Sequence, residues 1–277
     1  MAEAYTEHDI EILVATMNRS SLDFLVPMFP PGQFEDTRIL VINQTAEDKI
    51  LTSGFKNVRV INALEEGLSK SRNLALKNAL GKICIITDDD VVFTPGFKTT
   101  VCTAFNENPD AAMIAFRAKN GHGALYRKYK NRRITNTTTI DRLLILSIEM
   151  VVNREFITQK DIRFDEQFGL GSAFMMGEEA IFVKALYDAG GKLVLEPQVI
   201  VSHASEDTHK RVTVVQKYYV QGAFFSRLFG AMWLMWVFSK IASELKNNKI
   251  RFAEITVAIT AAFAGRKAFK EHEKNNA

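Results

Sequence analysis

Short runs of apolar residues recur along the chain, each bounded by polar or glycine-containing segments. Ile, Val and Leu fill most positions in these runs, without the strict alternation of a strand that has one face in solvent. Continuous apolar runs of this kind are typical of strands that helices cover on both faces. We therefore predict strands at residues 10–16, 38–43, 58–62, 82–87 and 111–117.

Segments with helical spacing lie between these strands, and we predict helices at residues 46–54, 67–80, 96–106 and 177–189. The last of them stops at the glycine pair 190–191, because glycine commonly follows a helix C-terminus. Residues 192–203 then form one or two strands with a proline between them. The alternation of strand and helix favours an α/β fold with a mostly parallel central sheet.

The pattern changes near residue 205, after which strand signals disappear and the sequence is helical in character. We therefore expect an α/β domain at residues 1–205 and a helical C-terminal segment at residues 206–277. Residues 228–238 form an apolar run, shorter than the roughly 20 residues that span a bilayer, with aromatic and basic residues around it. This pattern predicts either an amphipathic element on an anionic membrane surface or a helix packed against protein.

Composition narrows the function classes only slightly. The 277 residues carry a net charge of +3, which gives no electrostatic reason to expect a nucleic-acid partner. The N-terminus has acidic residues where a secretory signal would have basic ones, so we expect a cytoplasmic protein. Cys84 and Cys102 lie inside apolar runs, which predicts buried thiols.

Three consecutive aspartates, Asp88, Asp89 and Asp90, directly follow the fourth predicted strand. In open parallel sheets the ligand crevice lies outside the carboxyl ends of the strands. Adjacent carboxylates repel one another and need a cation or hydrogen-bond donors, and oxygen ligands suit Mg²⁺ or Mn²⁺ together with substrate phosphates. The triplet predicts a divalent metal that holds a diphosphate, the alternative being a solvated acidic turn.

Arg72 shares one stripe of its predicted helix with Leu68 and Leu76. A charge on an apolar stripe needs a partner, because an unpaired buried charge is costly. The planar guanidinium group suits phosphate, so we predict that Arg72 reaches the crevice rather than extending to solvent.

Five segments in this order resemble the family 2 inverting glycosyltransferases, which have the GT-A nucleotide-sugar fold and include enzymes of bacterial polysaccharide synthesis. The segments are "ILVATMNR", "GLSKSRNLAL", "ICIITDDDVVFTPGF", "FDEQFGLGSAFMMGEEAIFVKAL" and "VIVSH". The resemblance covers roughly residues 10–204, and its specificity lies in the order and spacing of the pieces. It implies a nucleotide-diphosphate sugar as donor, most often a UDP-sugar, and Mn²⁺ or Mg²⁺ at the aspartates.

The resemblance also assigns roles to residues. The metal would be held by Asp88, which also lies near the ribose, by Asp90 and by His203, with Asp89 able to replace either aspartate. Residues expected beside the nucleotide are Thr16, Asn18, Arg19, Arg72 and Asn73. Asn43 and Gln44 stand where the family usually has a base-recognising aspartate, so they would pair with uracil or indicate another nucleotide.

The resemblance implies that the catalytic residues are Glu178 and Glu179, at the start of the helix 177–189. Their position alone is explained by the helix dipole, which favours acids in a first turn. By resemblance, Glu179 is the general base and Glu178 orients it or binds the acceptor.

The acceptor implied by the resemblance is a saccharide or a lipid-linked saccharide, with peripheral contact to the inner face of the plasma membrane. One alternative is a sugar nucleotidyltransferase, which would require a glycine-rich phosphate-binding loop after the first strand. The sequence there, "VATMNRSS", contains no glycine, which counts against this alternative. The other is a non-catalytic nucleotide-binding or scaffold protein, which the pair Glu178 and Glu179 disfavours.

Overall fold

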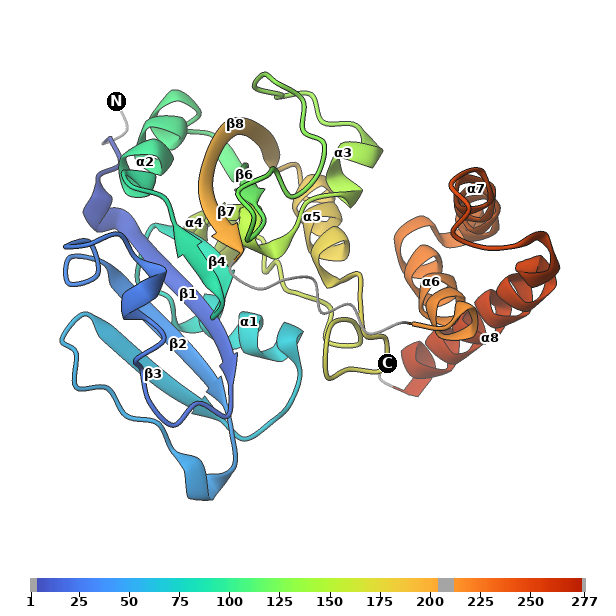
Figure 1. Ribbon diagram of the computed structural model, residues 1–277, viewed down its shortest axis with the longest axis horizontal. Coiled ribbons are helices and arrows are strands. Elements are labelled where there is room, and N and C mark those ends of the chain that lie inside the picture. The colour runs from blue at the N-terminus through green and yellow to red at the C-terminus, as the bar shows by residue number, and fades with distance from the viewer. Residues whose placement is uncertain (1–3, 204–211, 276–277) are drawn as a thin grey trace. The chain divides into compact units, whose positions relative to one another are not determined.

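The computed structural model of the chain describes residues 4–203 and 212–275 (Figure 1). The chain forms two compact units, Met1–Glu166 with Glu178–Asp207, and Gln167–Gly177 with Thr208–Ala277. The expected boundary at residues 205–206 lies outside the described residues. Residues 167–177 belong to the second unit. The sequence did not indicate this, because a loop has no periodic pattern that shows which distant part of the chain it packs against.

The first unit is built on one eight-stranded sheet with the order β3-β2-β1-β4-β7-β6-β8-β5. Neighbouring strands are parallel in the pairs β1–β2, β1–β4, β2–β3 and β6–β8, while β7 and β5 run antiparallel to their neighbours. The predicted α/β class with a mostly parallel sheet is confirmed. The strands are β1 Ile10–Met17, β2 Arg38–Gln44, β3 Val58–Ala63, β4 Ile83–Asp88, β5 Val91–Phe93, β6 Ala111–Lys119, β7 Met150–Asn153 and β8 Lys192–His203.

Helices cover both faces of this sheet, which explains the continuous apolar runs. Ile12 and Val14 of β1 pack into one core cluster with residues of α2, whereas Leu13 packs into the other with residues of α1 and α5. Successive side chains of a strand point to opposite faces, so both sets must be apolar. The helices of this unit are α1 Leu68–Asn78, α2 Phe97–Glu107, α3 Thr139–Leu143, α4 Arg154–Gln159 and α5 Glu178–Asp188.

The helix predicted at residues 46–54 is wrong, because only the short 3-10 helix η3 Glu47–Lys49 forms there. Leu51 is instead held in a loop by the side chain of Asn62 on β3. The Asn62 amide accepts from the Leu51 N–H at 3.0 Å and donates to the Leu51 carbonyl at 2.9 Å. A side chain distant in sequence thus replaces the helical hydrogen bonds of this residue.

Two details at the end of the sheet position the candidate site. The chain leaves β4 at Asp88 and enters β5 at Val91, and Val91 pairs with His203 of β8. The last strand is continuous through Pro197, where the pairing with β6 is irregular between Leu195 and Val199. Proline lacks an N–H for the ladder, so it is tolerated at such an interruption.

The second unit contains the helices α6 Val214–Phe229, α7 Trp233–Lys246 and α8 Ile255–Asn275, drawn in orange to red in Figure 1. Their shared core includes Tyr218, Phe225, Val237 and Ala262. Residues 214–246 are long and apolar enough, by length and composition alone, to count as one candidate membrane span. The chain breaks this stretch at Gly230, and Trp236 of α7 stacks on Phe229 of α6 at 4.2 Å between ring centroids.

Two glycines allow α6 and α8 to pack backbone against backbone. A β-carbon placed on Gly222 would lie 1.9 Å from the carbonyl oxygen of Ala262, and one on Gly265 would lie 1.8 Å from that of Tyr219. Real β-carbons do not approach other atoms so closely, and neither obstacle is a flexible side chain. Glycine is therefore required at both positions for this helix pair.

We predict that Gly222→Ala or Gly265→Ala destabilises the second unit by about 1–3 kcal/mol or more, because the helices must separate to admit the methyl group. Both tryptophans of the chain, Trp233 and Trp236, lie in this unit, so urea unfolding followed by tryptophan fluorescence reports on it directly. Gly54→Ala is the matched control, since no atom lies within 4 Å of its added carbon. Equal unfolding midpoints for all three variants would contradict the close packing.

Candidate active site

The carboxyl ends of the parallel strands bring most of the predicted polar residues to one edge of the sheet. Thr16 on β1 pairs in register with Asn43 on β2, and Asp88 on β4 pairs with Ala15 on β1. Asn18 follows β1 in a left-handed conformation with φ of 55°, which asparagine tolerates better than most residues. Its N–H donates to the carbonyl of Gln44 at 2.8 Å and fixes the turn after β1 against β2.

Arg72 is the centre of the site. Its side chain comes from α1, is 3% exposed and donates through Nη2 to Asp88 Oδ1 and through Nη1 to Glu178 Oε1, both at 3.2 Å. Glu179 Oε1 lies 3.8 Å from the same Nη1. One buried guanidinium thus joins the end of β4 to the first turn of α5. Arg72 therefore has charged partners, as its position on an apolar stripe led us to expect.

The charges around Arg72 do not balance, because one cation faces three carboxylates. Burial lowers the pKa of Arg72, but Asp88, Glu179 and Glu178 more than offset this, so its pKa is raised and it stays charged. Burial, and then the charge of Glu178, raise the pKa of Glu179 to about 7 against the opposing effect of Arg72. Glu179 is therefore a carboxyl group that exchanges its proton near neutral pH.

The two glutamates differ in their surroundings. Glu178 is 4% exposed and hydrogen-bonded to Arg72, whereas the Glu179 side chain is 23% exposed and lies farther from the guanidinium. Glu178 is consequently fixed in place, and Glu179 is the one with access to a ligand.

Asp89 faces β1 rather than Arg72. It accepts hydrogen bonds from the Thr16 hydroxyl and from Arg19 Nε, the latter at 2.7 Å. Arg19 in turn lies over the ring of Phe24, 4.9 Å from its centroid. The middle aspartate therefore anchors the turn after β1, and ligand binding by the outer two, Asp88 and Asp90, stays a prediction.

Asp90 lies beside His203, because β5 and β8 pair at this point. Its Oδ1 is 3.3 Å from His203 Nε2. A carboxylate and an imidazole are two ligands that Mn²⁺ accepts, and further ligands can come from substrate phosphates. Among residues 4–203 and 212–275, no three His, Cys, Asp or Glu side chains converge as a complete metal site. The pair alone is therefore an incomplete metal site, and a substrate would have to supply the remaining ligands.

The predicted amide residues already have partners within the protein. The Asn43 side chain accepts from the Arg19 N–H and donates to Asn62, both at 3.2 Å, and Gln44 Oε1 accepts from the Gly67 N–H at 2.6 Å. A base contact by Asn43 would have to replace or share one of these bonds. Their contribution to nucleotide recognition stays a prediction.

Asn73 has a different set of partners from Arg72, although the two are adjacent in sequence. Its amide exchanges hydrogen bonds with the backbone of Phe164, at 2.8 and 3.0 Å, and donates to Glu166 at 2.9 Å. The Phe164 ring lies 5.6 Å below the Arg72 guanidinium. Phe164 is a member of the site that the sequence did not reveal, because nothing local in the sequence links it to a helix so distant along the chain.

Comparison with known proteins gives a family and a fold. The sequence model described as Glycosyl transferase family 2 matches residues 33–181, while no curated protein sequence matches the chain. A crystal structure of TarS residues 1–349 from S. aureus superposes with a TM-score of 0.61 at 16% identity, covering 95% of this chain and 81% of TarS. Structures of the same TarS fragment with UDP-GlcNAc and with UDP give TM-scores of 0.61 and 0.57 at 16% identity, covering 91% of this chain and 79% and 78% of TarS.

Proposed function

Because this chain belongs to glycosyl transferase family 2, we propose that it transfers a sugar from a nucleoside-diphosphate donor to a saccharide acceptor. The observation that carries the proposal is the buried Arg72, which joins Asp88 at the end of β4 to Glu178 and Glu179 at the start of α5. A transferase needs a place for the departing diphosphate and a base for the acceptor, and this guanidinium connects candidates for both.

The donor we propose is a UDP-sugar, held at the carboxyl ends of β1, β2 and β4. Support comes from TarS of S. aureus, whose fold is similar and whose crystal structures contain UDP-GlcNAc and UDP. Arg72 Nε is buried and has no acceptor among the described residues, so a phosphate oxygen would satisfy it. Thr16, Asn18 and Arg19 would line the nucleotide from the β1 side.

We propose that the donor diphosphate is bound together with a divalent cation, Mn²⁺ or Mg²⁺, and the proximity of Asp90 and His203 supports this. Asp88, Asp90 and His203 would hold the cation together with the donor diphosphate. When bound, such a cation supplies positive charge that stabilises the departing diphosphate. Asp89 would contribute indirectly, since Thr16 and Arg19 occupy its carboxylate.

Glu179 would act as general base. Its carboxylate would take the proton of the acceptor hydroxyl as the oxygen bonds to the anomeric carbon and the bond to the diphosphate breaks. Arg72 would donate to the diphosphate as negative charge develops there. Glu178 would keep Arg72 in position. Attack from the side opposite the leaving group inverts the anomeric configuration.

A nucleotidyltransferase and a non-catalytic binding protein are the competing functions, and one assay separates them. The protein is incubated with Mn²⁺ and a set of nucleotide sugars, and released nucleoside diphosphate is measured with and without a chelator. A nucleotidyltransferase would instead consume nucleoside triphosphate and release pyrophosphate, and a scaffold would bind nucleotide without turnover.

We predict that Glu179→Gln lowers kcat by about 10²- to 10⁴-fold, because the amide keeps the size of the side chain but cannot accept the proton. Donor affinity should change less than about twofold, since the proposed phosphate contacts are made by other residues. Initial rates and nucleotide titrations measure the two effects separately.

The exposed Glu66 supplies the matched control, and Glu66→Gln should leave both quantities unchanged. The assignment of the base is refuted if Glu179→Gln turns over normally while Glu178→Gln alone is inactive. A product with retained anomeric configuration would also refute the mechanism.

We further propose that the second unit rests on an anionic membrane surface at the cytoplasmic side, where lipid-linked acceptors would be available. Met232, Met235 and Phe238 recur every three residues and are 58%, 57% and 48% exposed, so they form one apolar stripe. Lys246 and Lys249 follow it in sequence and would add attraction to anionic lipid.

We predict that Met235→Gln/Phe238→Gln weakens co-sedimentation with phosphatidylserine-containing vesicles by about tenfold or more, since each buried apolar side chain contributes roughly 1.5–3 kcal/mol. Val215→Gln/Val257→Gln is the control, because it changes two exposed apolar residues on α6 and α8. Equal sedimentation of both variants and the parent would rule out this stripe as the membrane contact.

A further inference from the structure

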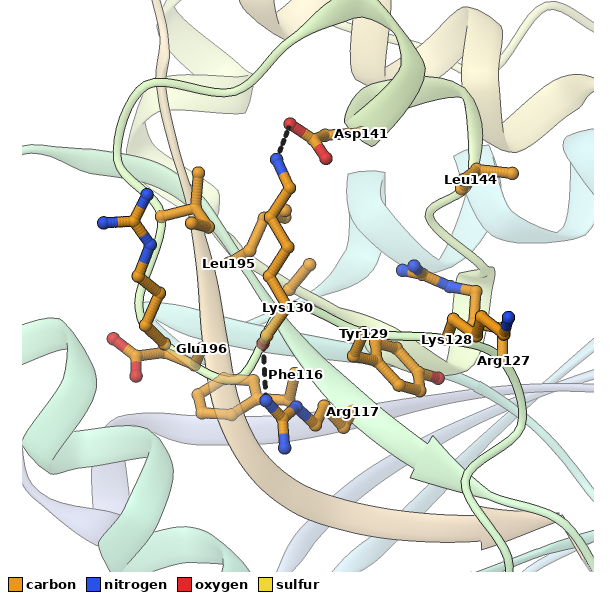
Figure 2. A pocket seen from close by; sticks show the side chains of 13 residues that line it. Phe116, Arg117, Arg127, Lys128, Tyr129, Lys130, Asp141, Leu144, Leu195 and Glu196 are labelled. Atoms are coloured by element: carbon orange, nitrogen blue, oxygen red, sulfur yellow. Dashed lines mark hydrogen bonds and ion pairs between the residues drawn. The ribbon is translucent and has the colours of Figure 1, made fainter.

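A cavity of the first unit lies away from Arg72. It has a volume of about 220 Å³, many times the roughly 10–15 Å³ that one water requires. Figure 2 shows its wall, formed by the end of β6, the segment 127–134, α3 and the middle of β8. It shares no lining residue with the candidate active site.

The lining of this cavity is strongly basic. Two acidic side chains, Asp141 and Glu196, line it together with five basic ones. The basic lining residues are Arg117, Arg127, Lys128, Lys130 and Arg132.

Ion pairs account for only part of this charge. Lys130 pairs with Asp141 at 2.9 Å, Arg127 pairs with Glu149 at 2.7 Å, and Glu196 pairs with Arg133, which lies outside the lining. Within the described ranges 4–203 and 212–275, no carboxylate forms an ion pair with the three remaining cations. These are Arg117, Lys128 and Arg132.

The segment that carries these cations is held firmly on the sheet. Glu149 is fully buried and accepts from Arg127 through both carboxylate oxygens, at 3.2 and 2.7 Å. It also accepts from the Tyr129 hydroxyl at 2.5 Å, and the Arg127 guanidinium lies 4.2 Å from the Tyr129 ring centroid. These contacts fix the backbone of the segment beside Lys128, so less of the chain has to be ordered when a ligand binds.

The guanidinium of Arg117 is only partly hydrogen-bonded within the protein. Its Nη2 donates to the Lys130 carbonyl at 2.5 Å, as the dashed line in Figure 2 marks, and to Asn131 at 3.3 Å. Its Nε is buried and has no acceptor among the described residues. A buried donor without an acceptor is unfavourable, and an anion in the cavity would remove that cost.

We propose that this cavity is a binding site for a phosphate group, either free or attached to a saccharide. A phosphate monoester carries a charge of roughly −1.5 to −2 at neutral pH and several acceptor oxygens, which suits three cations that have no carboxylate partner. Arg117 forms the inner wall, and the exposed Lys128 and Arg132 complete the site from the solvent side. The proposal concerns binding alone and does not depend on the transferase activity.

Calorimetric titration at low ionic strength and without divalent metal tests the site, with inorganic phosphate, glucose 6-phosphate and uncharged glucose as ligands. The parent should bind both phosphates with Kd below about 10 mM and should not bind glucose. Lys128→Ala/Arg132→Ala should weaken binding by about tenfold or more, because two charge-assisted contacts are lost. Lys56→Ala/Lys160→Ala removes the same charge at exposed positions elsewhere and should change Kd less than about twofold.

Melting temperatures equal to the parent's establish that both variants are folded. Equal affinities for the two phosphates would support a site for the phosphate group itself, and tighter binding of glucose 6-phosphate would support a phosphorylated saccharide. The proposal is overturned if neither phosphate binds the parent, or if the two double variants lose affinity equally.

Discussion

One buried guanidinium organises the candidate site. Arg72 extends from α1 to Asp88 at the end of β4 and to Glu178 at the start of α5, and it lies over the ring of Phe164. Removing it would leave the buried Glu178 carboxylate without a compensating charge, and breaking a buried ion pair typically costs 3–5 kcal/mol. Arg72 therefore links the strand end to the first turn of α5, in addition to the apolar packing of α5 against the sheet.

The same interaction sets the electrostatics of the site. Three carboxylates share one cation, so the surplus of negative charge, together with burial, keeps the Glu179 proton bound up to about pH 7. The surplus also favours a divalent cation at the neighbouring aspartates, where Asp90 and His203 lie together. Arg72 would thus connect the part of the site that binds a diphosphate to the part that removes a proton.

Much of this arrangement could be predicted from the sequence, because it depends on local patterns. Continuous apolar runs indicated β1 to β4 and β6, and the charge of Arg72 on an apolar stripe indicated a buried partner. The helix predicted at 46–54 failed because Asn62, on another strand, holds Leu51 in a loop. The short strands β5 and β7 were missed, since three or four residues carry too little periodicity.

Contacts between distant segments lay beyond the sequence. No local sequence pattern predicts that the Phe164 ring lies under Arg72. None predicts that Asp89 is hydrogen-bonded to Thr16 and paired with Arg19. The aspartate triplet alone left open which two members serve a ligand, and the contacts of Asp89 favour Asp88 and Asp90. The basic residues at 127–133 are visible in the sequence. Only the folded structure shows which of these cations form ion pairs with carboxylates and which do not.

The pH dependence of kcat/KM tests the central claim most directly, because it reports the pKa of the essential base in the free enzyme. A base with its pKa raised to about 7 is active only above that pH, so kcat/KM should rise tenfold per pH unit below 7 and level off above it. In Glu179→Gln the residual activity should lose this dependence. A limb near 4.5, the ordinary value for a glutamate, or an unchanged limb near 7 in Glu179→Gln, would contradict the account.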